Sequence, residues 1–222
     1  IKEVLEKLIH PIQVPPGVPQ ELADKDILKE SVFTHMFMKF TQIFFLNPEV
    51  GDHRKISLKI RNKVVGCVPD VRFYQHETRA KSPHLLVMLA EVKKDTLNQT
   101  DDDDPSEDSK TPWIQKYLNK SVLGQIGVEL MSECWNSAFA PCSLGIVCMR
   151  TEIIFMLLDT NLKHYDTWTK NKVSENLKSY IQYTKSYDIM KAEDRSEIMD
   201  LLFWLGCVQK GDFEHYFFFG QE

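Results

Sequence analysis

Two carboxylates and a lysine at the ends of two apolar segments are the residues best placed to do chemistry. Asp70 follows Val68-Pro69, and Glu91 and Lys93 follow an apolar run that begins at Leu85. Side chains two positions apart on a strand point to the same face, so Glu91 and Lys93 leave the strand side by side. A hairpin between the two segments brings Asp70, 21 residues earlier, beside Glu91. This combination predicts a site for a divalent cation and a water molecule.

The pattern Pro69-Asp70 followed by Glu91-Val92-Lys93 resembles the motif of the PD-(D/E)xK nuclease superfamily. Members share a compact αβββαβ core, and most active members hydrolyse phosphodiester bonds with Mg²⁺ or Mn²⁺. The resemblance covers about residues 26–160. It implies that the carboxylates of Asp70 and Glu91 and the backbone carbonyl of Val92 bind the metal, and that Lys93 lies near the attacking water. It also implies a polar residue on the helix after the sheet, here Gln125.

Similar nucleases often use a further carboxylate on the helix that precedes the sheet. Glu30 is the expected metal ligand of this kind, because it lies at the flank of the apolar face that residues 26–45 form as a helix. Glu21 and Glu49 are its rivals. Three roles are open for Lys93: to orient the water, to help deprotonate it, or to stabilise the charged phosphorane.

The hydrophobic pattern predicts a mixture of helices and strands. Helices are expected at 1–9, 26–45, 113–139, 173–187 and 193–208, and strands at 55–60, 64–74, 85–94, 144–149 and 153–159. The first three strands are expected to form an antiparallel meander, and Gln125 and Glu129 to share one flank of the third helix. The mixture predicts an α/β or α+β layered domain. Its expected parts are an N-terminal helix and Pro-rich loop at 1–25, a nuclease-like αβββαβ core at 26–160 and a C-terminal helical cap at 161–222.

The charge distribution permits nucleic-acid binding without predicting it. The net charge of the 222 residues is −5, and residues 101–108 hold six negative charges, so the rest of the chain carries +1 (−5 + 6). The acidic segment 95–110 is expected to be a solvated loop, with an acidic lid over the site as the alternative. The five cysteines show neither zinc spacing nor a disulfide pattern. No apolar run reaches the ~20 residues that span a bilayer. These features predict a nuclear or cytoplasmic protein without membrane contact.

The expected function is that of a metal-dependent nuclease acting on DNA, or alternatively on RNA. One alternative is an inert nuclease-like fold that binds protein or nucleic acid, with a protein partner at the C-terminal region, where residues 215–219 are rich in aromatic side chains. Another is an unrelated α/β domain. In that case Asp70 is a polar strand end, and Glu91 and Lys93 form an exposed ion pair of little energetic consequence.

Overall fold

The chain folds into a mixed α/β structure with a mostly antiparallel sheet. The computed structural model describes residues 29–50, 55–60, 63–75, 85–95, 97, 112–170 and 177–210. Within these residues the helices are α3 (Glu30–Gln42), α4 (Trp113–Tyr117), α5 (Lys120–Glu133), α6 (Leu162–Thr169) and α7 (Ala192–Lys210). None of the described helices is long and apolar enough to cross a membrane.

The main sheet has seven strands, and a separate hairpin has two. The strand order of the main sheet is β1 (Glu49–Val50), β4 (Val71–Tyr74), β5 (Leu86–Lys93), β6 (Ser143–Met149), β7 (Glu152–Asp159) and β8 (Tyr180–Tyr183), with β9 (Tyr187–Asp188) also paired to β7. Among the described strands, β5 and β6 pair in parallel, and every other pair is antiparallel. The hairpin consists of β2 (Ile56–Ile60) and β3 (Lys63–Cys67).

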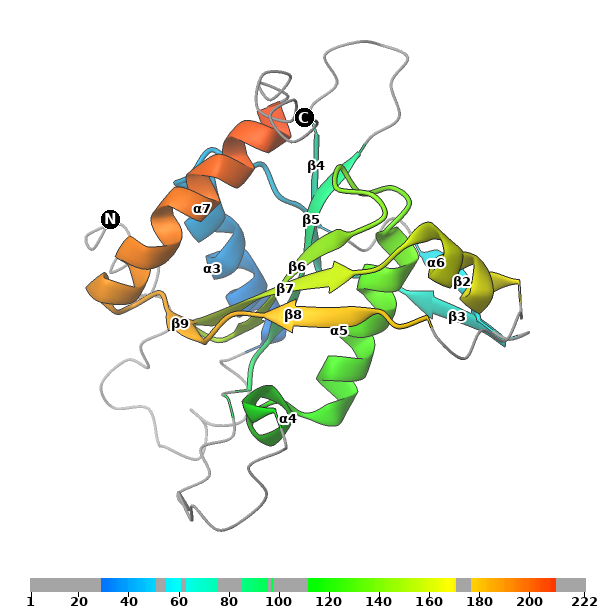
Figure 1. Ribbon diagram of the computed structural model, residues 1–222. Coiled ribbons are helices and arrows are strands. Elements are labelled where there is room, and N and C mark those ends of the chain that lie inside the picture. Colours follow the sequence, from blue (N-terminus) through cyan, green and yellow to red (C-terminus); the bar gives the residue numbers. More distant parts are fainter. Residues whose placement is uncertain are drawn as a thin grey trace.

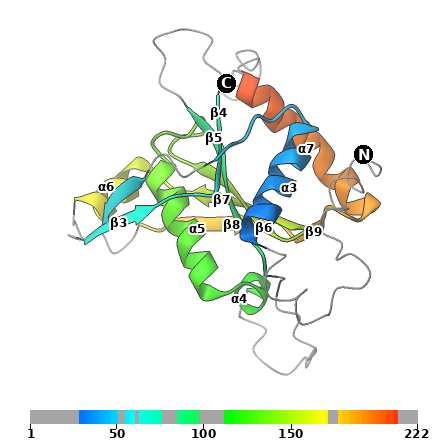
Figure 2. The same cartoon turned by 180° about the vertical axis from the view of Figure 1, so that it is seen from behind.

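Helices cover both faces of the main sheet (Figures 1 and 2). Helices α3 and α7 lie on one face, and α4 and α5 lie on the other, with the β2–β3 hairpin packed outside α5. Because its two faces are both covered, the central strand β5 is apolar and buried from Leu86 to Ala90 rather than alternating.

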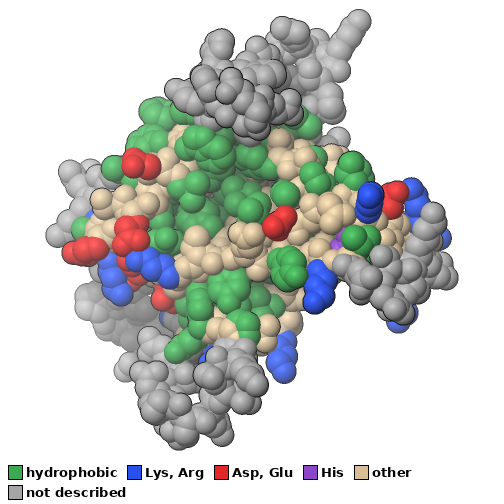
Figure 3. Space-filling view, in the orientation of Figure 1, with side chains coloured by type: hydrophobic (Ala, Val, Ile, Leu, Met, Phe, Trp, Pro, Cys, Tyr) green, Lys and Arg blue, Asp and Glu red, His purple; other side chains and the backbone are tan. Residues whose placement is uncertain are grey.

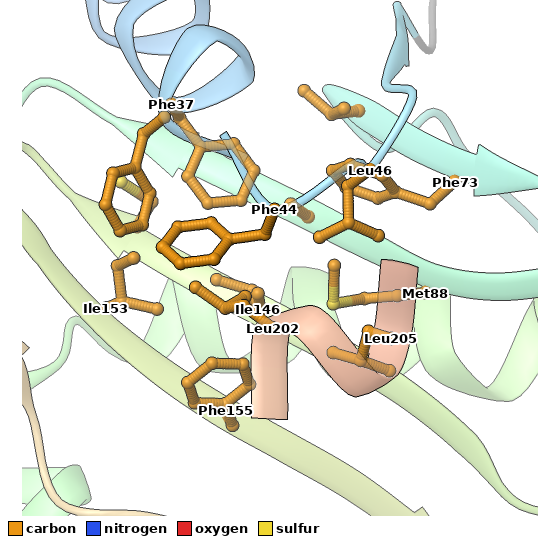
Figure 4. Packing of buried hydrophobic residues seen from close by; sticks show 14 of the residues in the cluster. Phe37, Phe44, Leu46, Phe73, Met88, Ile146, Ile153, Phe155, Leu202 and Leu205 are labelled. Carbon is orange, nitrogen blue, oxygen red and sulfur yellow. The ribbon is translucent and has the colours of Figure 1, made fainter. Parts of the chain in front are cut away.

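The apolar cluster between the sheet and helices α3 and α7 is built largely from aromatic and branched side chains (Figure 4). The buried positions of α3 recur at the three- and four-residue spacing of a helix face. This cluster includes Phe37, Phe40 and Phe44 from α3 and the turn after it. It also includes Phe73 and Met88 from the sheet, and Leu202 and Leu205 from α7. Helix α7 therefore packs on this face of the sheet and helps to bury it.

A second apolar cluster lies on the opposite face, under α4 and α5. Successive residues of β6 serve the two clusters in turn, since Ile146 belongs to the first and Val147 to the second. Helix α5 contributes Val122, Ile126 and Leu130. The packing on this face fixes which side of α5 points at the sheet, and therefore which of its polar residues lies near the ends of β4 and β5.

Several sequence predictions match the observed elements. Helix α3 lies within 26–45, β5 within 85–94, and α7 covers 193–208. The two strands expected at 144–149 and 153–159 are β6 and β7, joined as a hairpin. The helix predicted at 1–9, the N-terminal segment 1–25, and nearly all of the acidic segment 95–110 and the aromatic residues 215–219 lie outside the described residues.

Four other predictions about elements were wrong. The expected strand 64–74 is two strands, β3 and β4, separated by residues 68–70, and the expected meander does not form because β2 and β3 make a sheet of their own. The long helix 113–139 is broken at Asn119, whose side chain caps α5 by accepting a 2.9 Å hydrogen bond from the backbone N–H of Ser121. In the expected helix 173–187, residues 180–183 instead pair with β7 as β8, so the C-terminal region is not purely helical.

Candidate functional site

The start of β4 lies beside the end of β5, because the two strands pair antiparallel. Asp70 directly precedes β4, and its Oδ2 accepts a 2.8 Å hydrogen bond from the backbone N–H of Val92. The Asp70 carboxylate is thereby held against the segment that carries Glu91 and Lys93. Since the N–H and C=O of a strand residue point to the same neighbouring strand, the Val92 carbonyl faces the side on which Asp70 lies. The structure thus brings together the residues of the sequence motif.

Lys93 joins carboxylates from two elements. Its Nζ is in direct contact with Oε1 of Glu91 and lies 3.5 Å from Oε1 of Glu30. Glu30 begins α3, so the first turn of that helix reaches the end of β5. Of the rival carboxylates, Glu49 is exposed on the edge strand β1, and Glu21 lies outside the described residues. Glu30 is therefore the acidic residue that α3 adds to this group.

Asp70, Glu91 and Glu30 make up the acidic group of this site. Burial dominates the electrostatics of Asp70 and Glu91. Glu91 is fully buried, and its Oε2 has no hydrogen-bond partner among the described residues. Burial raises the pKa of Glu91 to about 7, and the charge of Asp70 adds to the rise. Burial also raises the pKa of Asp70, although the bond from Val92 and the charge of Lys93 oppose it. Two carboxyl groups with raised pKa values, one of them with an unpartnered oxygen, are stabilised by any cation that enters.

The ammonium of Lys93 is stabilised in its charged form. Burial by itself lowers the pKa of Lys93, but the hydrogen bond to Glu91 and the charges of Glu91, Asp70 and Glu30 outweigh burial and raise the pKa above its ordinary value. Lys93 therefore remains a cation at neutral pH. A cationic Lys93 donates hydrogen bonds and stabilises negative charge, but it does not accept a proton.

Helix α5 adds a buried acid to which the sequence analysis gave no role. Nε2 of Gln125 donates a 3.1 Å hydrogen bond to Oε1 of Glu129, and Glu129 is fully buried with its Oε2 unpartnered among the described residues. Burial raises the pKa of Glu129 to about 8, with the charge of Glu91 as the second cause. Glu129 thus faces the acidic group directly, whereas Gln125 is exposed and hydrogen-bonds to Glu129. The sequence signal that could have revealed this role is that Glu129 is an acidic residue on the core side of an amphipathic helix.

A buried ion pair, also missed, fixes the position of α5 against β4. Nε of Arg72 donates a 2.9 Å hydrogen bond to Oε1 of Glu133, and both side chains are almost completely buried. The second oxygen, Oε2 of Glu133, accepts from Asn136. Arg72 is two residues from Asp70, and Glu133 is one helical turn from Glu129. The pair therefore ties together the two elements that carry these acids.

A cavity of about 340 Å³ opens between β3 and α5, beside this group. Its lining residues are Val65, Gly66, Cys67, Val68, Gly124, Gln125, Val128 and Glu129. Because Glu129 lines the cavity and interacts electrostatically with Glu91 and Asp70, the cavity adjoins the acidic group.

Surface charge does not gather into a broad basic face in the view of Figure 3. On the described part of that face, apolar side chains occupy the centre, and lysines and arginines are scattered toward the periphery. Binding of a polyanion on this side of the molecule thus has no large cationic field to draw on. A phosphate group bound on this face therefore depends on local contacts rather than on a broad basic surface.

The donor chemistry of the group fits a hard divalent cation. Magnesium prefers oxygen ligands and is usually held by one or two carboxylates plus waters. Asp70 and Glu91 would supply two carboxylates and the Val92 carbonyl a third oxygen, while Glu30 lies 3.5 Å from Nζ of Lys93. Within the described ranges, no three His, Cys, Asp or Glu side chains are arranged as a metal-binding group. The fit therefore rests on the Asp70 and Glu91 pair.

Comparison with known proteins adds no relative. No family model matches the chain, and no curated protein or solved structure was found to be similar to it. What this protein does must therefore be inferred from its geometry and chemistry.

Proposed function

We propose that this protein is a metal-dependent nuclease that hydrolyses phosphodiester bonds, with DNA rather than RNA as the substrate. The observation that carries the proposal is the convergence of Asp70, Glu91 and Lys93 where β4 begins and β5 ends, with Glu30 reaching them from α3. Carboxylate oxygens beside a fixed ammonium suit a reaction in which negative charge on phosphate must be neutralised.

The order of elements supports the resemblance to the PD-(D/E)xK superfamily. Helix α3 is followed by β1, β4 and β5, which pair antiparallel in that order, then by α5, and then by β6 parallel to β5. This order agrees with an αβββαβ core. In this assignment the first strand of the core is β1, and the β2–β3 hairpin is an insertion between β1 and β4. The strands of this core therefore differ from the ones that the sequence predicted for it.

Each residue of the group has a definite part in the proposed reaction. Asp70 and Glu91 would hold Mg²⁺ or Mn²⁺ with the Val92 carbonyl, and the bound cation would supply an activated water and charge neutralisation on the phosphate. The ammonium of Lys93, which contacts Glu91, would orient the water and stabilise the negative charge that develops on the phosphorane. Its third possible role, deprotonation of the water, would require the neutral amine instead. Glu30 holds the Lys93 ammonium in place.

The proposal is tested by cleavage of end-labelled single- and double-stranded DNA and RNA with Mn²⁺, Mg²⁺ or EDTA. We expect cutting that requires metal and that falls by about 100-fold or more in Lys93→Ala, as when a charge-stabilising donor is removed from an active site. Lys170→Ala is the matched control. That lysine is exposed directly after the end of α6 and pairs with Asp166. Equal loss in both variants, or cutting that persists in EDTA, contradicts the proposed roles.

Metal binding is tested separately from cutting. Calorimetric titration with Mn²⁺ is expected to give one binding event in the wild type and none in Asp70→Ala. A protein that binds no Mn²⁺ and cuts no substrate contradicts the nuclease proposal. That outcome favours the inert binding module as the function of the fold.

A further inference from the structure

The cavity between β3 and α5 has the size and walls of a small ligand site. Its volume of about 340 Å³ falls at the lower end of the roughly 300–1,000 Å³ found for small-molecule pockets. Three valines, Val65, Val68 and Val128, make its walls apolar. Such a space accommodates one small group and is too small for a folded segment of another protein.

Two of the residues that line the cavity are glycines, one on each wall. An ideal Cβ built on Gly124, on the surface of α5, meets no atom within 4 Å. On the other wall, a Cβ on Gly66 would contact Cε of Lys55 and lie 3.3 Å from its Nζ. The absence of a side chain at position 66 therefore lets the Lys55 chain lie across the strand.

Polar groups are confined to one side of the cavity. Glu129 and Gln125, which both belong to α5, line the cavity, and the amide of Gln125 donates to Oε1 of the buried Glu129. A nucleobase has the matching distribution, because its faces are apolar and its edge carries hydrogen-bond donors and acceptors. The exposed lysines on and beside the β2–β3 hairpin match the phosphate that accompanies each base.

We infer that this cavity binds one unpaired nucleobase of a single-stranded nucleic acid, adjacent to the phosphate whose ester bond is cut beside Asp70 and Glu91. The inference rests on the proposed nuclease function and names its substrate class. Glu129 connects the cavity with the acidic group, since it lines the cavity and faces Glu91 and Asp70. A base that is paired and stacked within a duplex cannot reach between β3 and α5 without leaving the stack. The protein therefore selects single strands over duplexes.

The lysines of the β2–β3 hairpin extend the contact along the strand. Lys55, Lys59 and Lys63 are all exposed on or beside this hairpin. An ammonium that contacts a phosphate releases a counterion, so its removal weakens binding for every base sequence and lowers the salt dependence. Lys55→Ala is expected to reduce the slope of log K against log salt by about 1.

Filling the cavity from Gly124 is the direct test. Gly124→Leu places a side chain in open space and replaces a helix glycine by a better helix former, so the variant is expected to melt at or above the wild-type temperature. Binding of a fluorescein-labelled thymidine dodecamer is followed by fluorescence anisotropy in EDTA, which prevents metal-dependent cutting. We expect the leucine to weaken binding by about tenfold, the effect of losing one base contact.

Two further variants keep the test decisive. Gly127→Ala is the control on the same helix, because its Cβ meets only Cδ1 of Ile181 at an ordinary 3.6 Å and the residue does not line the cavity. Its binding should equal that of the wild type. Gly124→Ala adds a single methyl group to the cavity and should weaken binding less than leucine does. If Gly124→Leu does not fold, binding by Gly124→Ala equal to that of Gly127→Ala overturns the inference.

The outcomes separate the cavity from the catalytic proposal. Two results together support base binding in the cavity, even if no metal-dependent cutting is seen. The wild type binds the single strand more tightly than its duplex, and Gly124→Leu weakens binding to the single strand. Cutting of single strands with the same KM in Gly124→Leu and the wild type overturns the cavity and leaves the nuclease proposal standing. A wild type that binds the duplex more tightly than the single strand, or binds neither, also overturns it.

Discussion

Replacing Glu129 by Gln tests the electrostatics of the buried acidic group. The pKa of Glu129 rises from 4.5 to about 8 in the folded protein, first because of burial and second because of the charge of Glu91. A carboxyl group with a higher pKa in the folded state holds its proton more tightly there than in the unfolded chain. Its stabilising contribution is therefore fully present below about pH 4.5 and is lost as the pH rises through about 8. Glutamine has nearly the same shape and stays neutral at every pH.

The size of the effect follows from the pKa values. A rise of about 3.5 (8 − 4.5), at ~1.4 kcal/mol per pKa unit, sets an upper bound of about 5 kcal/mol on the cost of ionising Glu129 in the folded protein. Glu91 titrates near 7 and shares that cost, so the two contributions are not additive. The quantity to compare is the free energy of unfolding of Glu129→Gln minus that of the wild type. We expect this difference to be about 2–3 kcal/mol larger at pH 9 than at pH 5.

Urea unfolding at pH 5, 7 and 9 in EDTA, followed by circular dichroism, measures this difference. The wild-type free energy of unfolding should fall from pH 5 to pH 9, and that of Glu129→Gln should fall less. Glu193→Gln, at an exposed position in the first turn of α7, is the control and should follow the wild type within ~0.5 kcal/mol. Parallel pH profiles for Glu129→Gln and the wild type would refute the reasoning, because they would mean that Glu129 ionises as easily in the folded protein as in the unfolded chain.

Two further predictions concern the packing that positions the site. Gly206→Ala should destabilise the protein by about 1–3 kcal/mol in urea, since its Cβ would collide with the backbone oxygen of Phe44, whereas Gly124→Ala on the open side of α5 should be neutral or stabilising. Arg72→Met should cost about 3–5 kcal/mol because it leaves Glu133 buried without its partner, and the double variant Arg72→Met/Glu133→Met should recover most of that loss. A double-mutant cycle with zero coupling energy between the two positions would contradict the second prediction.

The local pattern of residues was sufficient to place the centre of the site. Asp70, Glu91 and Lys93 meet because strand side chains alternate and because β4 and β5 pair antiparallel, and both properties can be inferred from short segments. Glu30 also followed from local pattern, since its position on the flank of the apolar face of α3 decides which way it points. The metal, the substrate and the activity remain predictions.

Only the tertiary structure decided which strands share a sheet and which side chains of α5 reach the site. The two-residue strand β1 has no periodic pattern of its own and exists through its pairing with β4, while β2 and β3 pair with each other. Residues 180–183 are a strand because the edge of β7 offers unpaired backbone groups, which local helical spacing does not reveal. Glu129 and the Arg72–Glu133 pair depend on how α5 packs across the sheet. The contacts of Glu129 and of the Arg72–Glu133 pair join residues more than 30 positions apart, and their energies depend on burial that no local pattern of residue types encodes.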